Sequence, residues 1–349
     1  MASKNQDEDQ KAAVSHKKSH FHQRAINFSA PALRWMCMRQ ALPQRSKSEH
    51  NQTLPRKVRV TESMTDTADN RQPTADPAEA NAFFPSPYSL SQYTADKTNF
   101  DGLATDQKYQ GGRWKVLVIA TDERYMQMKN GKFFSTGNHP VETLLPIHHM
   151  QQAGYGIDVA TVSGNPGKFE WWAYPDKDEA VAEAWKQTEE AFRSPQKLSA
   201  VLADGLDDYA AIFIPGGHGA MNSIPFSTEL GEALQYFVDN DRLVITLCHG
   251  PAALLAAGTN SEKNVFAGYE IVAFPDSLDF GANIDIGYLP GEMPWKLGET
   301  LQEAGVVIKN DDMTGATTRD RNLLTGDSPL AAHQLGKESA LALLEKFGE

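Results

Sequence analysis

The sequence has very little cysteine and no long apolar run. Cys37 and Cys248 are the two cysteines in 349 residues, too few for the disulfide framework of a small secreted domain. No stretch of about 18 apolar residues occurs, as a membrane-spanning helix requires. The polar amino terminus has no apolar core or small-residue cleavage site of a secretory signal. We therefore expect a reduced, cytoplasmic protein that makes no use of a membrane.

Positive charge is scarce over most of the chain. The net charge is −12, yet residues 1–60 hold 12 Lys and Arg against 4 Asp and Glu, and the remainder holds 21 against 41. An acidic body argues against a nucleic-acid groove. Residues 1–75 lack periodicity and are predicted to form a disordered or basic extension, with an organelle transit peptide as the alternative. Residues 76–349 then form the body.

Short apolar runs alternate with helical spacing through the body. Alternating strands and helices predict an α/β fold with a mostly parallel sheet sandwiched by helices. Residues 165–205 exceed an ordinary crossover and are predicted to form a small subdomain with residues 81–110. Asn138 is the expected N-cap of the first long helix. The strands are expected at residues 114–120, 157–162, 210–215, 243–247, 270–274, 306–309 and 323–325, and the helices at 139–153, 228–240, 294–304 and 328–347.

The chemistry is expected where the strand at residues 243–247 ends. Cys248, His249 and Gly250 follow that strand directly and precede a predicted helix. This is the pattern of a nucleophile elbow, which exposes a reactive side chain above the carboxyl edge of a sheet. The helix N-terminus favours a thiolate, and His249 is a candidate partner or base. An inert buried cysteine remains the alternative.

Three other segments offer groups that would complete such a site. Gly216 and Gly217 end a neighbouring strand, where backbone N–H groups can approach an oxyanion; an ordinary turn is the alternative. Glu142 lies in the first turn of a predicted helix, either facing the site or simply favoured by the helix dipole. Asp276 and Asp279 follow another strand, and either carboxylate can orient a histidine or belong to a solvated turn.

Long motifs in order resemble a known family. The chain is similar, over residues 81–348, to the superfamily of intracellular-protease-like and parkinsonism-associated deglycase proteins. Within it the chain resembles the bacterial heat-shock chaperone branch, that of protein/nucleic acid deglycases and glutathione-independent glyoxalases (glyoxalase III). The motifs are Asn-Ala-Phe-Phe-Pro-Ser at 81–86, Tyr-Ser-Leu-Ser-Gln-Tyr at 88–93, Asp-Glu-Arg-Tyr at 122–125, Phe-Ser-Thr-Gly-Asn-His-Pro at 134–140, Pro-Gly-Gly-His-Gly-Ala at 215–220, Leu-Cys-His-Gly-Pro-Ala-Ala at 247–253 and Leu-Leu-Thr-Gly-Asp-Ser-Pro at 323–329.

The resemblance assigns roles to particular residues. It implies that Cys248 is the nucleophile, that His249 and Asp279 complete a triad, and that Glu142 faces the thiol. It also implies a flavodoxin-like core, a smaller second domain and a homodimer. We place the oxyanion donors at Gly216 and Gly217.

The branch also carries a metal site that this sequence does not reproduce. The resemblance places its His, Glu and His ligands at Gln151, Gly156 and Thr188, and none of these is a good transition-metal ligand. His148 and His149 lie nearby, but adjacent helical residues point about 100° apart and cannot both face one ion. We therefore expect no metal.

The resemblance implies a Cys-dependent, cofactor-free enzyme. Expected substrates are methylglyoxal, glyoxal and their early adducts on proteins and nucleotides, with lactate or glycolate as product. A holdase chaperone that binds unfolded client proteins through the aromatic segments 81–93 and 169–174 is the alternative from another class. Glutamine amidotransfer needs a downstream His-x-Glu pair, whereas His333 is followed by Gln-Leu-Gly. Peptidase activity is poorly supported.

Overall fold

A seven-stranded sheet forms the centre of the protein. The computed structural model describes residues 69–261 and 263–349, so the expectations for residues 1–68 lie outside it. The strands run in the order β12-β13-β9-β8-β3-β6-β7, and every neighbouring pair is parallel except β12 with β13. Their bounds are β3 Lys115–Ile119, β6 Gly156–Thr161, β7 Gln196–Lys197, β8 Tyr209–Ile214, β9 Leu243–Leu247, β12 Thr317–Asp320 and β13 Leu323–Gly326.

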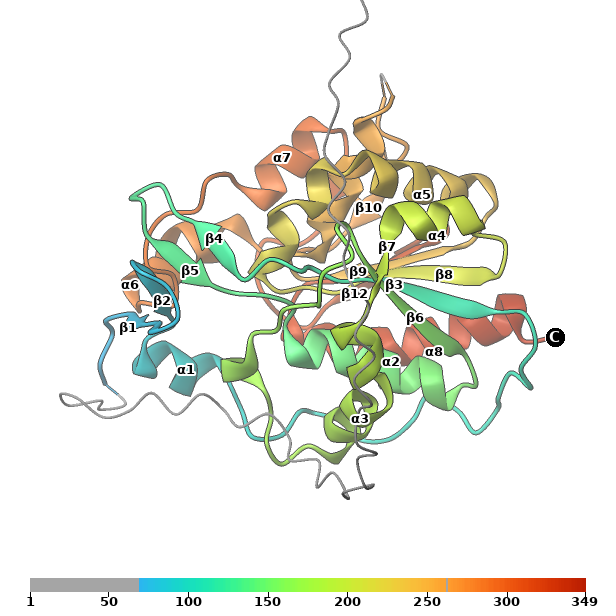
Figure 1. Cartoon of the computed structure of the whole chain (residues 1–349), viewed down its shortest axis with the longest axis horizontal. Helices are drawn as coiled ribbons and strands as arrows, with labels where there is room; N and C mark the ends of the chain where they lie inside the picture. Colours follow the sequence, from blue (N-terminus) through green and yellow to red (C-terminus); the bar gives the residue numbers. More distant parts are fainter. Residues whose placement is uncertain (1–68, 262) are drawn as a thin grey trace, which may run out of the picture. The chain divides into compact units, whose positions relative to one another are not determined.

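Helices cover both faces of this sheet (Figure 1). On one face α2 (Pro140–Gln152), α3 (Glu179–Arg193) and α8 (Ala332–Phe347) pack over one hydrophobic cluster. The other face carries a second cluster beneath α4 Leu198–Asp204, α5 Thr228–Asp239, the 3-10 helix η4 Gly250–Gly258 and α7 Leu297–Glu303. Continuous apolar strands are explained by this double coverage, because a parallel sheet is buried on both sides. The flavodoxin-like α/β sandwich predicted from the sequence is confirmed.

A smaller four-stranded sheet lies beside the central one (Figure 1). Its order is β1-β2-β5-β4, and the short helix α1 (Pro87–Tyr93) follows β2. Its strands are β1 Thr74–Ala75, β2 Ala82–Phe84, β4 Tyr125–Gln127 and β5 Phe133–Ser135. Part of residues 165–205 instead extends the central sheet, because β7 pairs with β6. The subdomain boundaries proposed from the sequence stay a prediction.

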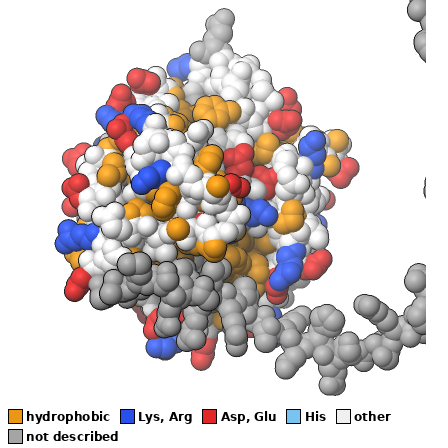
Figure 2. Space-filling view, turned by 60° about the vertical axis from the view of Figure 1, so that its left-hand side comes forward, with side chains coloured by type: hydrophobic (Ala, Val, Ile, Leu, Met, Phe, Trp, Pro, Cys, Tyr) orange, Lys and Arg blue, Asp and Glu red, His pale blue; other side chains and the backbone are white. Residues whose placement is uncertain are grey.

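Among the described helices, none is long and apolar enough to cross a membrane. The face that carries the small sheet displays hydrophobic side chains among charges of both signs (Figure 2). The remaining short elements connect these layers. They are η1 Trp171–Ala173, η2 His218–Met221, η3 Ile224–Phe226, β10 Glu270–Ile271, the π-helix η5 Leu278–Ala282, α6 Asn283–Asp285, β11 Val307–Ile308 and η6 Pro329–Ala331.

Two local expectations were wrong. The N-cap of α2 is His139, not Asn138, and its side chain makes no capping hydrogen bond. The Asn138 amide instead accepts from the Thr121 N–H at 3.0 Å and donates to the Thr121 and Lys168 carbonyls. Asn138 therefore joins the end of β3 to a distant loop, a use that local sequence cannot reveal. The body also begins before residue 76, since β1 is Thr74–Ala75.

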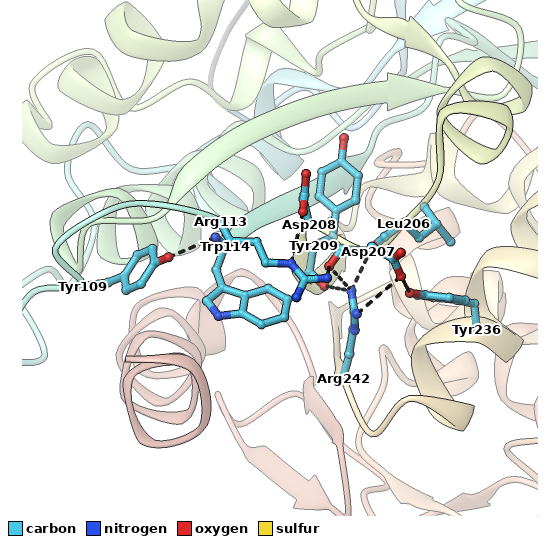
Figure 3. A network of polar contacts seen from close by, with 9 residues as sticks. All are labelled: Tyr109, Arg113, Trp114, Leu206, Asp207, Asp208, Tyr209, Tyr236 and Arg242. Carbon is cyan, nitrogen blue, oxygen red and sulfur yellow. Dashed lines mark hydrogen bonds and ion pairs between the residues drawn. The ribbon is translucent and has the colours of Figure 1, made fainter. Parts of the chain in front are cut away.

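A buried arginine closes the amino-terminal edge of the central sheet (Figure 3). Arg242 is 7% exposed, and its Nη1 donates to the carbonyls of Leu206, Asp207 and Tyr209 at 2.6–2.9 Å. Its guanidinium lies 5.2 Å from the centre of the Trp114 ring, a cation–π distance. Arg242 thus ties together the residues that precede β3, β8 and β9.

Candidate active site

Cys248 occupies a strained turn at the carboxyl end of β9. Its φ is 58°, a left-handed conformation that residues other than glycine rarely adopt and that often marks a functional site. Gly250 must lack a side chain, because a Cβ there would lie 2.4 Å from Thr246 Oγ1 and 2.6 Å from the Ile214 carbonyl oxygen. The elbow geometry predicted from Cys-His-Gly is present. The element that follows is the 3-10 helix η4 rather than an α-helix.

Cys248, His249 and Asp279 form one hydrogen-bonded chain. The Cys248 Sγ lies 3.2 Å from His249 Nδ1, and His249 Nε2 lies 2.7 Å from Asp279 Oδ2. Asp279 comes from η5, 31 positions away in the sequence from Cys248, and all three side chains are buried. Asp279, which the family resemblance singled out, is in the chain, whereas Asp276, which the local pattern alone did not separate from it, accepts from the Gly298 and Glu299 N–H groups.

Asp279 also binds a second histidine, which the sequence analysis did not single out. His218 Nε2 lies 3.0 Å from Asp279 Oδ1, and the Asn283 amide donates to the same oxygen. Burial alone would raise the pKa of Asp279, but the charges and hydrogen bonds of His218 and His249 outweigh it and hold that pKa well below its usual range. Asp279 is therefore ionised and bridges two imidazoles.

The pKa values of the two histidines shift in opposite directions. Burial lowers the pKa of both rings, but Asp279 outweighs burial at His218 and raises its pKa. At His249 burial and the neighbouring His218 prevail, so its pKa is lowered. His249 is then neutral, with its proton on Nε2 facing the carboxylate. This leaves Nδ1 as an acceptor for the thiol proton.

Glu142 lies in the first turn of α2, fully buried. Burial raises the pKa of its carboxyl well above the usual range, and the Cys248 thiol and the Gly217 N–H oppose this by stabilising the charged form. Neither carboxyl oxygen has a well-formed hydrogen bond within the described part of the chain. A buried carboxyl next to a thiol, without firm partners, is suited to hold and transfer a proton.

The thiolate expected at rest is not supported by the surroundings of Cys248. Burial raises the pKa of the Cys248 thiol well above its usual range, and Glu142 raises it further. Desolvation of the sulfur therefore outweighs any effect of the helix terminus. A protonated thiol needs a base before it can act as a nucleophile, and His249 Nδ1 lies 3.2 Å from the sulfur.

The Gly216-Gly217 turn leaves room for the side chains of Glu142 and Cys248. A Cβ on Gly216 would lie 1.9 Å from Glu142 Oε2 and 2.8 Å from the Cys248 Cβ. Gly217 has φ 100° and lines the cavity above Cys248. Its N–H faces Glu142, and the Gly216 carbonyl accepts from the His139 N–H at 3.0 Å. The role of both glycines as oxyanion donors stays a prediction.

A cavity of about 230 Å³ opens above the thiol. Much of its wall is aromatic, which suits a small organic substrate with few polar contacts. Glu170, Asn283 and Tyr288 line it and went unnoticed in the sequence, because they come from segments without a recognisable motif. The lining residues are Gln92, Tyr93, His139, Glu142, Glu170, Trp172, Gly217, His218, Cys248, His249, Phe274, Asn283, Tyr288, Met313, Pro329 and Leu330.

The residues at the branch's metal positions do not fit a metal ion. Gly156 has no side chain, and the Thr188 hydroxyl donates to the Ala184 carbonyl at 2.7 Å. His149 Nε2 bonds His333 Nδ1 at 3.0 Å, so that nitrogen is not free for an ion. Among the described residues, one cluster has donor atoms close enough to share an ion. It consists of His218, His249 and Asp279, whose donor atoms already bond one another.

Comparison with known proteins places the chain in a family. The DJ-1/PfpI family matches residues 133–278, a range that includes Glu142, Cys248 and His249. The chain is 56% identical over 271 residues to the protein/nucleic acid deglycase HchA of Staphylococcus aureus strain MSSA476, covering 77% of this chain and 93% of that protein. The protein of the same name from strain JH9 matches with the same identity and coverage.

Solved structures share the fold. Glyoxalase III from Candida albicans matches with a TM-score of 0.54 and 23% identity, over 66% of this chain and 97% of that one. The Rapid Encystment Protein of Francisella tularensis matches with a TM-score of 0.56 and 19% identity, over 66% and 98%. The chain belongs to the DJ-1/PfpI family, in its protein/nucleic acid deglycase branch.

Proposed function

We propose that the protein is a cofactor-free deglycase and glutathione-independent glyoxalase with Cys248 as its nucleophile. Its substrates are methylglyoxal, glyoxal and their early adducts on proteins and nucleotides. The observation that supports this most strongly is the buried chain Cys248–His249–Asp279 beside Glu142. The 56% identical relative is named a protein/nucleic acid deglycase, which points to the same chemistry.

The reaction follows from the thiol. As His249 takes its proton, the Cys248 sulfur adds to the aldehyde carbon and forms a hemithioacetal. A proton then moves from that carbon to its neighbour, which needs an acid and a base close by. The product is a thioester, and water hydrolyses it to lactate or glycolate. Every electron comes from the substrate, because one carbon is oxidised as the other is reduced.

An early glycation adduct enters the same scheme. The Cys248 sulfur replaces the modified amine or thiol on the carbon that carries it, and the repaired group leaves with the thiol proton. The resulting hemithioacetal isomerises to the thioester as above, and water hydrolyses it to a hydroxy acid. Release of the repaired group is a hydrolase reaction overall, whereas turnover of the free dicarbonyl is that of a lyase. Both depend on the same sulfur.

One assay tests the proposal directly. Purified protein is mixed with methylglyoxal in the absence of glutathione, and lactate and its chirality are measured. We expect one enantiomer of lactate, in catalytic amounts, from the wild-type protein. Consumption of methylglyoxal in amounts equal to the protein, without lactate, would show simple thiol trapping and contradict the proposal.

The chaperone, dimer and cytoplasmic location stay predictions. The aromatic residues proposed to bind unfolded clients pack against one another in part: the rings of Phe169 and Trp171 are stacked 4.9 Å apart. Amidotransfer gains no support, since His333 bonds His149 and Asp101. A Cys248→Ala protein that still prevents client aggregation would separate chaperone from enzyme activity.

A further inference from the structure

Glu170 is a second carboxyl in the wall of the cavity. It immediately precedes η1, is 1% exposed and lines the same cavity as Cys248 and Glu142. The Thr136 hydroxyl donates to its Oε1 at 2.7 Å. Its Oε2 is buried and has no well-formed hydrogen bond among the described residues, although the His218 backbone N–H faces the carboxyl. Nothing in the mechanism above uses this group.

A buried carboxyl oxygen without a well-formed hydrogen bond is unusual, because such a group costs free energy. The position of Glu170 is nevertheless well fixed. Its backbone N–H donates to the Asn138 carbonyl at 3.0 Å, and the neighbouring Trp172 Nε1 donates to the Ser135 carbonyl. A rigidly held side chain with one unused oxygen at a cavity wall is arranged to meet a ligand.

The proposed reaction needs an acid at a second place. While a base beside Cys248 removes the proton from carbon 1, the oxygen on carbon 2 gains charge and must receive a proton. Glu142 contacts the thiol and is suited to act at carbon 1. Glu170 comes from another segment and shares the cavity, which suits it to the far end of a two-carbon substrate.

We propose that Glu170 donates a hydrogen bond to the oxygen on carbon 2 and then protonates it. This inference rests on the proposed function and adds a catalytic residue to it. As the C1–H bond breaks, its electron pair forms the C1–C2 double bond, and the carbonyl π pair of carbon 2 takes the Glu170 proton to give an enediol. The enediol then loses the proton of its carbon 1 hydroxyl to Glu170 and gains one on carbon 2 from the base. The thioester forms and Glu170 regains its proton.

The surroundings of Glu170 supply the required protonation state. Burial raises its pKa to about 7, while His218 and the Thr136 hydroxyl oppose the rise and Asp279 adds to it. Glu142, Cys248 and Tyr288 also face it, and the charge on Glu170 raises the pKa of each. Because the pKa lies near neutral pH, the carboxyl can both give and regain a proton.

The test compares Glu170→Gln with two matched variants. Glutamine keeps the shape and can still accept from Thr136, but it cannot release a proton. We expect kcat for lactate formation from methylglyoxal to fall about 100-fold, while alkylation of Cys248 by iodoacetamide stays within twofold of wild type. Glu170→Asp should recover part of the loss. Glu232→Gln, at an exposed position on α5, should equal wild type.

Three results would overturn the assignment. Turnover by Glu170→Gln within threefold of wild type, with normal alkylation of Cys248, would reject Glu170 alone. If the wild-type protein makes no lactate, the proposed function fails and this inference with it. If Glu170→Gln does not fold, the wild-type pH profile decides. The value of kcat/KM should fall above about pH 7, and a profile that keeps rising would reject Glu170 as the general acid.

Discussion

The two edges of the central sheet bury charge in opposite ways. At the amino-terminal edge, Arg242 Nη1 donates to three backbone carbonyls, which are fixed acceptors that do not titrate. At the carboxyl edge, Asp279 bridges His218 and His249, while Glu142 and Glu170 carry oxygens without partners. The first arrangement satisfies its charge; the second leaves protons able to move.

This difference separates stability from chemistry. Fully satisfied buried polar groups hold one structure, and removing a member leaves its partners unpaired. Partly satisfied titratable groups cost stability but gain pKa values matched to proton transfer. The carboxyl edge is also where open parallel sheets place their ligands. Changes at one edge should therefore affect activity, and changes at the other should affect folding.

The largest effect is expected at Cys248. Cys248→Ser keeps the size of the side chain, but a hydroxyl gives up its proton far less readily than a thiol, so turnover of methylglyoxal should fall at least about 1,000-fold. The melting temperature should stay within a few degrees of wild type. Lactate assays and thermal unfolding on the same preparation check both. Turnover within about tenfold of wild type would remove Cys248 from the mechanism.

The opposite pattern is expected at Arg242. Arg242→Met removes three buried hydrogen bonds to backbone carbonyls and should lower the free energy of unfolding by about 3 kcal/mol, with kcat within twofold. Arg113→Met is the control, because Arg113 binds Asp208 at the half-exposed surface, where such pairs contribute below about 1 kcal/mol. Urea unfolding measures both. Equal effects of the two substitutions would contradict the role given to Arg242.

Acid should act through buried histidines and leave the arginine network unchanged. Burial lowers the pKa of His139 and of His149 to about 3, so each side chain is neutral in the folded protein. A histidine with a lowered pKa stabilises the fold above its unfolded pKa of about 6.5, and this is lost as pH falls toward 3. Each histidine should lower the free energy of unfolding by about 2 kcal/mol as the pH falls from 6.5 to 5. A melting temperature constant over that range would contradict this.

A smaller effect is expected from the start of the chain. A protein beginning at residue 69 should keep the melting temperature and turnover of the full chain, since the composition of residues 1–68 cannot support a core. Starting at residue 77 deletes β1 and Asp76, whose carboxylate accepts from the Ser135 hydroxyl at 2.7 Å and pairs with Arg124. That protein should melt several degrees lower. Identical melting would place the boundary after Asp76.

No effect is expected from chelation. With Gly156 and Thr188 at two metal positions of the branch, EDTA should change neither melting nor turnover. Elemental analysis provides the independent measure. About one zinc per chain, lost together with activity, would contradict this and draw attention to His148 and His149.

The sequence alone was enough to predict the fold class and to single out Cys248 as the candidate nucleophile. Residues 243–247 were expected to form a strand and do so as β9, because the sequence of a buried parallel strand is a continuous apolar run. Cys248 and Gly250 were recognisable since the elbow is a local structure. Glu142 was recognisable as a first-turn carboxylate, and the family resemblance then implied that it faces the Cys248 thiol.

Only the tertiary structure decided which groups share protons. Asp279 could not be separated from Asp276 by local pattern, and His218 was part of a glycine-rich turn until the fold placed its Nε2 3.0 Å from Asp279. Glu170 lies on a segment without a motif and meets Cys248 only across the cavity. The state of the thiol was misjudged for the same reason. A pKa depends on burial and on neighbours from distant segments, and both exist only after the chain has folded.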